Sequence, residues 1–312
     1  MNKNAKIYVA GHQGLVGSAF IRRLRALDYQ NLLVRTHAEL DLIDQQATDA
    51  FFAAEKPDYV FLAAARVGGL YANNTYRAEF LYQNLMIQSN TIAAAWRAGV
   101  QRLLFLGASC VYPRDCPQPI LEDYFLTGPS EPTNEPYAIA KIAGIKLCES
   151  YNRQYGTQYL TVMPASVYGP NDSYDEKKSH VLPALIRKVY EAKIRGDQEI
   201  VIWGTGKPMR EFLYVDDLAD ACIFLMNSHS AMEGLINIGT SEDVTISELA
   251  ETIMEVVGFQ GRLIFDTSKP DGSPRKLLNT DRMRALGWQP STALKEGIVR
   301  AYQDFLERCS SF

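Results

Sequence analysis

The sequence contains a tyrosine and a lysine, Tyr137 and Lys141, whose spacing could put their side chains to joint chemical use. They stand near the start of a long helical pattern, so a spacing of four places both on one helix face, about one turn apart. A nearby ammonium favours the phenolate form of a tyrosine, whose pKa is otherwise about 10. Beside a nicotinamide, such a pair could protonate a carbonyl oxygen while hydride reaches its carbon. Taken alone, the spacing fits an ordinary solvated helix pair equally well.

A glycine-rich turn near the N-terminus predicts a phosphate-binding element. Residues 6–10 read as a short buried strand, Gly11, Gly14 and Gly17 follow, and an amphipathic helix is expected over residues 18–27. Glycines let the backbone approach a pyrophosphate, and a helix N-terminus attracts its charge. The spacing is G-x-x-G-x-x-G rather than G-x-G-x-x-G, and a plain tight βα turn is the alternative.

Two basic residues follow the second predicted strand, residues 31–35, where a residue that contacts the adenosine ribose is expected. An acid at this place binds the ribose 2′-hydroxyl of NAD, whereas a basic residue accommodates the 2′-phosphate of NADP. Arg35 and His37 therefore favour NADP. Single basic residues at strand ends are often only solvated, so the preference indicated is mild.

Alternating strand and helix patterns predict the sheet that positions these residues. Buried strands are expected at residues 59–65, 102–107 and 159–163, and helices at 48–55, 78–98 and 137–155. This alternation predicts an α/β fold with a Rossmann-type doubly wound parallel sheet. The strand at 102–107 delivers Ala108, Ser109 and Cys110 at its C-terminal end, where ligands gather in such sheets.

The βα alternation breaks after Gly169. We therefore expect an NADP-binding Rossmann domain over residues 1–169, with returning segments at about 213–240. Residues 170–312 are expected to form a smaller α/β substrate lobe, with helices near 181–194, 246–257 and 293–308 and strands near 199–203 and 263–265.

Composition and charge exclude several classes of protein. Hydrophobic residues make up 47% and charged residues 22% of the chain, as in ordinary globular proteins. A net charge of −4 gives no general reason to expect nucleic acid or an anionic membrane as partner. The five cysteines are scattered, odd in number and without metal-type spacing, which favours reduced thiols in a cytoplasmic protein and no metal site. No apolar run approaches about 18 residues, so neither a membrane span nor a signal peptide is expected.

With these features in view, the chain resembles the extended short-chain dehydrogenase/reductases, and its motifs are similar to those of the GDP-L-fucose synthase family. The motifs that carry the resemblance are residues 11–14, 63–69, 73–75, 110–113, 132–141, 179–181, 208–212 and 269–276. The resemblance covers essentially the whole chain. It implies an NADPH-dependent homodimer that epimerises GDP-4-keto-6-deoxy-D-mannose at C3 and C5 and then reduces C4 to give GDP-L-fucose.

The resemblance also implies roles for individual residues. Cys110 and His180 match the acid–base pair that moves protons at C3 and C5, and thiol and imidazole pKa values lie a small shift from neutrality. Tyr137 would protonate O4 as hydride reaches C4, while Lys141 would lower the pKa of the tyrosine and hold the nicotinamide ribose. Without the resemblance, a small buried cysteine and a satisfied loop histidine would be the favoured interpretations.

Further residues match the family's binding regions. Those expected at the cofactor are Gly11, Gln13, Gly14, Leu15, Val16, Gly17, Arg35, His37, Lys141 and His180. Those expected at the GDP sugar are Arg187, Trp203, Arg210 and Lys276. Cations among the latter suit a diphosphate.

The chain departs from the family pattern at several of these places. Ala108 stands where the family has a catalytic serine, and Ser109 is the adjacent hydroxyl that could replace it. Gln13 and His37 stand where the family binds the NADP 2′-phosphate with arginines, and Ser166 stands where it has an asparagine beside the sugar.

Two alternatives follow from these departures. One is an enzyme for a related GDP-4-keto-deoxy sugar, such as the 3,6-dideoxy precursor of GDP-L-colitose, in which only C5 is inverted. The other is a catalytically impaired dinucleotide-binding protein, as Ala108 suggests. The joint presence of Cys110, Tyr137, Lys141 and His180 argues against the second, since an inactive site has no need of all four.

Overall fold

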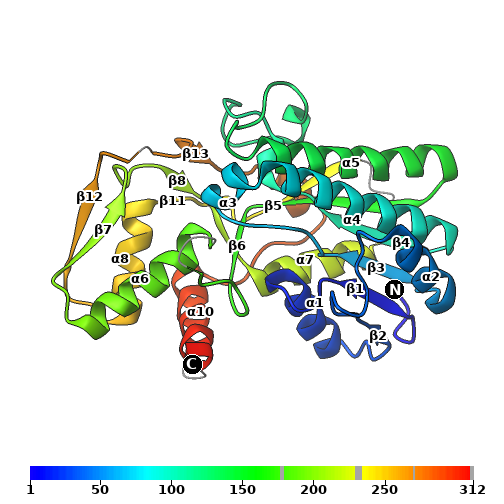
Figure 1. Ribbon diagram of the computed structural model, residues 1–312, viewed down its shortest axis with the longest axis horizontal. Coiled ribbons are helices and arrows are strands. Elements are labelled where there is room, and N and C mark those ends of the chain that lie inside the picture. The colour runs from blue at the N-terminus through cyan, green and yellow to red at the C-terminus, as the bar shows by residue number, and fades with distance from the viewer. Residues whose placement is uncertain (176–178, 229–233, 270, 310–312) are drawn as a thin grey trace.

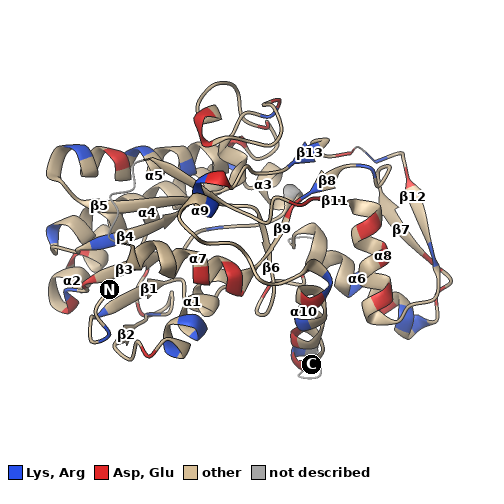
Figure 2. Ribbon diagram, turned by 180° about the vertical axis from the view of Figure 1, so that it is seen from behind, with Lys and Arg blue, Asp and Glu red and all other residues tan. Residues whose placement is uncertain are grey.

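The computed structural model describes residues 1–175, 179–228, 234–269 and 271–309 (Figure 1). A parallel sheet flanked by helices forms the larger part, and a smaller lobe built around α6, α8 and α10 lies beside it. Figure 2 shows acidic and basic residues distributed along the outer helices, whereas the central strands are mostly uncharged. No helix in the described ranges combines the length and the apolar character needed to span a membrane.

The large sheet has six parallel strands in the order β10-β5-β4-β3-β1-β2. They are β1 (Ile7–Ala10), β2 (Leu32–Leu33), β3 (Tyr59–Leu62), β4 (Arg102–Leu106), β5 (Gln158–Pro164) and β10 (Leu235–Ile238). Continuous apolar runs suit strands that are covered on both faces. The predicted α/β class with a Rossmann-like parallel sheet is confirmed, although β2 is shorter than the predicted 31–35.

Helices cover the sheet in two groups on opposite faces (Figure 1). In one group α1 (Leu15–Ala26) packs against α7 (Val215–Asn227). In the other, α4 (Arg77–Arg97) packs between α2 (Gln45–Glu55) and α5 (Glu135–Tyr155), and the short α3 (Leu70–Thr75) precedes it. The sequence places the ends of α5 clearly: a proline lies in its first turn, and Gly156, with φ of 68°, terminates it.

The smaller lobe has its own hydrophobic core. Helices α6 (Val181–Arg195), α8 (Ile246–Val257) and α10 (Leu294–Cys309) enclose it together with the parallel pair β7 (Glu199–Trp203) and β12 (Arg262–Asp266). Thr245 and Glu248 form a capping box that fixes the start of α8.

Short strands join the two parts. A small sheet contains β8 (Met209–Arg210), β11 (Val244–Thr245) and β13 (Arg275–Lys276), and β6 (Ser166–Tyr168) pairs with β9 (Phe212–Tyr214).

Two segments after residue 169 pack into the core of the large sheet. The first comprises α7 and β10, within the predicted returning stretch 213–240, of which residues 229–233 lie outside the described part. The second includes Leu278, Met283 and Trp288, with α9 (Asp281–Ala285) against β10, and sequence patterns assigned it to the substrate lobe. Two cores are thus present, while the domain boundary at residue 169 stays a prediction.

From β1 the chain adds β2 on one side and then β3 on the other side, so the strand order reverses between β1 and β3. In open α/β sheets, ligands bind at the C-terminal edge at this point. The glycine turn follows β1 directly, so the fold itself indicates where a dinucleotide site should be sought.

Candidate active site

Close packing requires two glycines of the glycine turn, one where the turn lies against the loop after β3 and one where α1 begins against the turn itself. A Cβ atom on Gly11, which has φ of 80°, would lie 2.7 Å from the Ala64 nitrogen. A Cβ atom on Gly17 would lie 2.1 Å from the Gly11 carbonyl oxygen. Gly14 begins α1 without a side-chain cap, which leaves the first amides of the helix available to an anion.

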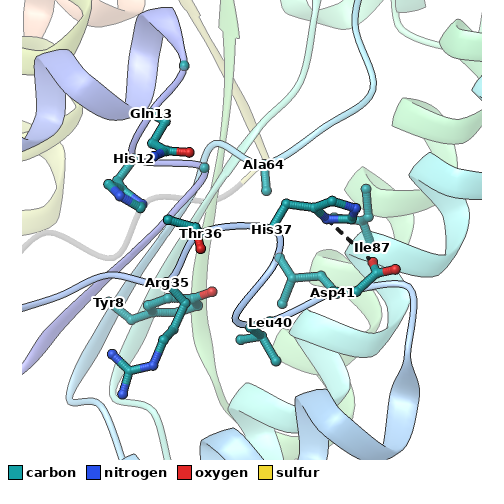
Figure 3. Close-up of a pocket in the computed structure, with 13 residues that line it drawn as sticks. Tyr8, His12, Gln13, Arg35, Thr36, His37, Leu40, Asp41, Ala64 and Ile87 are labelled. Atoms are coloured by element: carbon teal, nitrogen blue, oxygen red, sulfur yellow. Dashed lines mark ion pairs between the residues drawn. The ribbon is translucent and has the colours of Figure 1, made fainter.

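A pocket with a volume of about 160 Å³ opens beside this turn (Figure 3). It is lined by five of the predicted cofactor residues: Gly11, Gln13, Gly14, Arg35 and His37. Leu15, Val16 and Gly17 form the first turn of α1 next to it. The pocket lies at the expected switch point of the sheet, and its open glycine turn fits a dinucleotide.

The guanidinium of Arg35 is engaged elsewhere. It donates to the Glu55 carboxylate at 2.7 Å and to the Val34 carbonyl at 2.8 Å, and it lies 5.4 Å from the Phe51 ring centre. Figure 3 shows it directed away from His37 and Gln13. Arg35 thus pairs with a carboxylate on α2, and its expected contact with a 2′-phosphate stays a prediction.

His37 and His12 are the remaining basic side chains of the pocket. The His37 side chain is 81% exposed, and its Nδ1 lies 3.7 Å from the Asp41 carboxylate. His12 was not singled out from the sequence, although it stands inside the glycine turn. Its Nδ1 is buried and has no hydrogen-bond partner among the described residues. A bound ligand could supply that partner.

Tyr137 and Lys141 share one face of α5, as their spacing predicts, and meet the C-terminal end of β4. The Lys141 ammonium donates to the Leu106 carbonyl at 2.8 Å and lies 5.7 Å from the centre of the Tyr137 ring. Lys141 is 4% exposed, and this burial lowers its pKa to about 8. The edge of Phe80 packs against the Tyr137 ring, with centroids 6.4 Å apart.

The predicted lowering of the Tyr137 pKa by Lys141 is not found. Burial raises the pKa of the phenol above its ordinary value, and the neighbouring Cys110 raises it further. The physical reason is that the phenol is buried, and the Lys141 ammonium, which donates to the Leu106 carbonyl, does not offset this effect. A phenol that retains its proton suits the role of proton donor.

The segment after β4 brings Cys110 to the same place. Ala108 is extended, with φ of −159° and ψ of 146°, and the 3₁₀ turn Ser109–Val111 follows. Cys110 is 7% exposed, and burial raises the pKa of its thiol, while the ammonium groups of Lys276 and Lys141 act in the opposite direction. The structure thus brings Cys110, Tyr137 and Lys141 into one cluster.

His180 comes from the smaller lobe and stands at the N-terminus of α6. Its side chain is exposed, but the surrounding protein removes enough of its hydration to lower the pKa of the imidazole. Residues 176–178, just before it, lie outside the described part of the chain.

The residues expected at the GDP sugar occupy two places. Arg210 and Lys276 are paired neighbours in the parallel strands β8 and β13, and burial lowers the pKa of both. Arg187, on α6, binds the Glu191 carboxylate at 2.7 Å and the Tyr174 carbonyl at 3.0 Å. Trp203, 70% exposed, ends β7.

A buried carboxylate adjoins this region and was missed from the sequence. Glu211 is 2% exposed, and its carboxylate accepts hydrogen bonds from the backbone of Thr240, Ser241 and Leu278 at 2.7, 2.8 and 2.8 Å. Burial raises its pKa to about 7. Glu211 lines a small cavity together with Ser109, Ala165, Ser166, Lys276 and Leu278. The sequence signal that could have indicated Glu211 is its position within residues 208–212, one of the motifs that carry the family resemblance.

Comparison with known proteins shows which family this chain matches and which relatives it is similar to. The NAD-dependent epimerase/dehydratase family matches residues 7–239. A putative GDP-L-fucose synthase 2 of Arabidopsis thaliana is 55% identical over 98% of this chain and 93% of its own length. The GDP-L-fucose synthase of Escherichia coli is 53% identical over 98% of both chains.

More distant relatives also match almost the whole chain, in sequence or in structure. The GDP-L-colitose synthase of Yersinia pseudotuberculosis is 38% identical over 96% of this chain and 98% of its own length. The crystal structure of a GDP-L-fucose synthetase from Naegleria fowleri bound to NADP is 28% identical, with a TM-score of 0.92 over 100% of this chain and 97% of that one.

Proposed function

We infer the reaction from the following premise: this chain belongs to the NAD-dependent epimerase/dehydratase family and, within it, to the GDP-L-fucose synthases. It converts GDP-4-keto-6-deoxy-D-mannose to GDP-L-fucose with NADPH, by epimerisation at C3 and C5 and reduction at C4. The observation that carries this function is the cluster of Cys110, Tyr137 and Lys141 at the end of β4, on the same sheet edge as the glycine turn.

The cofactor site is formed by the glycine turn, the N-terminus of α1 and the pocket beside them. The amides of Leu15, Val16 and Gly17 would hold the pyrophosphate, and His12, Gln13 and His37 would line the place of the adenosine ribose. When bound, NADPH supplies the hydride that C4 receives. Lys141 would hold the nicotinamide ribose.

Cys110 and His180 carry the epimerisation. The 4-keto group acidifies the protons on C3 and C5, so one group must remove a proton while another delivers one to the opposite face of the ring. Cys110 follows β4 of the large sheet and His180 begins α6 of the smaller lobe, so a sugar bound between the two parts would have to contact both.

Tyr137 carries the proton transfer of the reduction. Its buried phenol keeps its proton in the free protein and donates it to O4 as negative charge develops there. Lys141 joins α5 to the end of β4 through its hydrogen bond to the Leu106 carbonyl.

Arg210, Lys276 and Trp203 belong to the surface that receives the nucleotide sugar. Arg210 suits a diphosphate, and the exposed indole of Trp203 offers a face for stacking. The Arg187 guanidinium could bind a phosphate only after its hydrogen bond to the Glu191 carboxylate is broken. Binding of the diphosphate by Arg187 therefore requires a different side-chain conformation.

The active form is a cytoplasmic homodimer that pairs through α4 and α5. Large apolar side chains are exposed along this helix pair, among them Tyr82 on α4 at 58% and Ile139 on α5 at 45%, and Tyr71 on the preceding α3 is 60% exposed. Exposed apolar patches of this kind mark interaction sites. Tyr82→Glu should shift the protein to the monomer in analytical ultracentrifugation, and a native protein that is monomeric at micromolar concentration contradicts the assignment.

The second candidate substrate is the 3,6-dideoxy analogue used for GDP-L-colitose. Ser166, which replaces the family's asparagine, lines the small cavity with Ser109 and favours a sugar with a different pattern of hydroxyls. A third hypothesis is that Ala108 impairs catalysis. The joint presence of Cys110, Tyr137 and Lys141 argues against it.

The test is to incubate the protein and NADPH with each GDP-4-keto sugar separately and to identify the products by NMR. We expect GDP-L-fucose to form from the 6-deoxy sugar with a higher kcat/KM than the product of the 3,6-dideoxy sugar. A higher kcat/KM for the dideoxy sugar overturns the substrate assignment, and no turnover of either supports the impaired reading.

A further inference from the structure

We propose that Asn237 is a positioning residue for epimerisation: its buried carboxamide holds the Tyr112 hydroxyl and thereby fixes the turn that presents Cys110 to the sugar. This role rests on the proposed function of Cys110. It gives a task to a residue of β10 that lies outside the family motifs and outside the catalytic cluster.

Asn237 is a polar side chain in the interior of an apolar strand. It is 0% exposed, and its neighbours in β10 are Ile236 and Ile238. A buried carboxamide costs free energy unless its oxygen and its nitrogen are hydrogen-bonded. An apolar residue would pack here without that cost, so the partners of the carboxamide indicate what the asparagine is for.

Three hydrogen bonds hold Asn237 in one orientation. Its side-chain oxygen accepts from the Tyr112 hydroxyl at 2.6 Å, and its side-chain nitrogen donates to the Ile120 carbonyl at 2.9 Å. Its backbone amide donates to the Glu122 carboxylate at 3.0 Å. All three partners belong to the segment that follows Cys110, so Asn237 joins that segment to the large sheet.

Tyr112 is the partner that lies nearest to Cys110 in the chain. It is 2% exposed, and burial raises the pKa of its phenol, so the hydroxyl keeps its proton and donates. Tyr112 stands two residues after Cys110 and directly follows the 3₁₀ turn Ser109–Val111. The bond to Asn237 therefore fixes the C-terminal end of that turn.

The other end of the turn is anchored independently. The Gly107 amide donates to the Val162 carbonyl of β5 at 2.8 Å, and the Val111 amide closes the turn on the Ala108 carbonyl at 3.1 Å. Cys110 thus lies between one anchor on β5 and one on β10, which are neighbouring strands of the large sheet. Without the second anchor, the loop that follows the turn would move the turn and the thiol with it.

Tyr137 does not depend on this anchor. It stands on α5, which Lys141 joins to the Leu106 carbonyl at 2.8 Å. Loss of the bond to Asn237 should therefore slow proton transfer at C3 and C5 much more than hydride transfer to C4. A bond with a purely structural role would lower stability and leave both rates of the folded protein unchanged.

The test variants remove the bond from each side. Tyr112→Phe removes only the hydroxyl, Asn237→Ala removes the carboxamide, and the double variant shows whether the two residues act through each other. Tyr29→Phe is the matched control, because the Tyr29 hydroxyl is also that of a buried residue and donates to the Asn227 carboxamide oxygen at 3.0 Å. Tyr29 precedes β2, whereas Cys110 follows β4, so the control lies at the opposite edge of the parallel sheet.

The first measurement needs no sugar, so its outcome does not depend on the substrate assignment. Amide hydrogen exchange of a peptide that contains residues 108–113 is followed by mass spectrometry in the full-length protein. We expect Tyr112→Phe and Asn237→Ala to speed this exchange at least about fivefold, the factor that one ordinary hydrogen bond contributes, and Tyr29→Phe to leave it unchanged.

The second measurement separates the two half-reactions. Exchange of the sugar C3 and C5 protons with heavy water is measured with NADP⁺ in place of NADPH, and reduction is measured as single-turnover oxidation of NADPH by sugar that has already been epimerised. We expect Tyr112→Phe to lower kcat for proton exchange about tenfold, with KM changed less than about twofold and the reduction rate less than about threefold. The double variant should be no slower than Asn237→Ala, because the two residues act through one bond.

Unchanged hydrogen exchange at residues 108–113 in Tyr112→Phe overturns the proposal whatever the sugar does. If hydrogen exchange speeds up but kcat for proton exchange stays at the native value, the bond is only structural and the positioning role is refuted. If Asn237→Ala does not fold, Tyr112→Phe alone decides. If hydrogen exchange speeds up as expected but the native protein turns over neither GDP-4-keto sugar, the anchor stands and the proposed function fails.

Discussion

Ala108 is the departure from the family pattern with the largest predicted effect on rate. It is extended and half-buried at the end of β4, directly before the turn that carries Cys110. A serine hydroxyl at this position would add a hydrogen-bond donor beside Tyr137 for the charge that develops on O4 during reduction. Ser109 does not share that direction, since its side chain lines the cavity with Ser166 and Glu211.

The magnitude follows from the geometry of a preorganised site. One donor aimed at a developing oxyanion is worth ~2.7–4 kcal/mol, or roughly 100- to 1000-fold in rate. Because the packing of α5 against the end of β4 already fixes Tyr137, we expect Ala108→Ser to approach the lower figure in the rate of C4 reduction. Exchange at C3 and C5 should rise less, since its enolate places only part of the charge on O4.

The assay is single-turnover oxidation of NADPH by sugar that has already been epimerised, with Ser109→Ala as the matched control. A rate that Ala108→Ser changes by less than about threefold, together with an unchanged Ser109→Ala, refutes the need for a hydroxyl at this site. If Ser109→Ala is strongly impaired instead, Ser109 already supplies the donor, and the direction inferred from the cavity is wrong.

The remaining predictions concern the acid–base pair, the cofactor and the lobe junction. Cys110→Ser and His180→Asn should retain NADPH binding, measured by fluorescence, while deuterium exchange at C3 and C5 falls at least about 100-fold; undiminished exchange in both variants removes the pair from the mechanism. NADPH should be preferred over NADH, but by less than arginines at positions 13 and 37 would give, because the pocket presents Gln13 and His37 there; titration calorimetry of both cofactors measures this, and a preference for NADH at neutral pH contradicts it. Stability in urea should decrease as pH rises from 4.5 to about 7, because the folded Glu211 carboxyl binds its proton more tightly than the unfolded one. Glu211→Gln should reduce this slope without removing it, because burial also raises the pKa of Asp172 to about 7; an identical slope in both proteins would show that Glu211 does not contribute.

Local patterns in the sequence were sufficient for much of the fold. The strands that became β3, β4 and β5 are continuous apolar runs, and the close approach of Gly11 to Ala64 explains why a glycine turn follows β1. A helix was predicted near residues 246–257, which α8 occupies, and in the structure a capping box and Gly258 mark its two ends.

The features that were missed depend on contacts between residues far apart in the chain. The pairing of Arg35 with Glu55 depends on the packing of α2 and has no signal in the sequence around Arg35. The return of residues 278–288 to the large core follows from β10 and α9 and has no periodic signal of its own.

The site was predicted in the same uneven way. The Tyr137–Lys141 pair lies within one helix, so its spacing specified the relative placement of the two side chains. The hydrogen bond between Tyr112 and Asn237 joins residues 125 positions apart, and no local pattern encodes it.

The most direct measurement of the central claim is the position of deuterium in the product. GDP-4-keto-6-deoxy-D-mannose is converted in heavy water with NADPH that carries ordinary hydrogen, and the product is analysed by NMR. The account predicts GDP-L-fucose with deuterium at C3 and C5, from the proton transfers of Cys110 and His180, and with hydrogen from NADPH at C4. A reduced product that keeps its original hydrogens at C3 and C5 would contradict it.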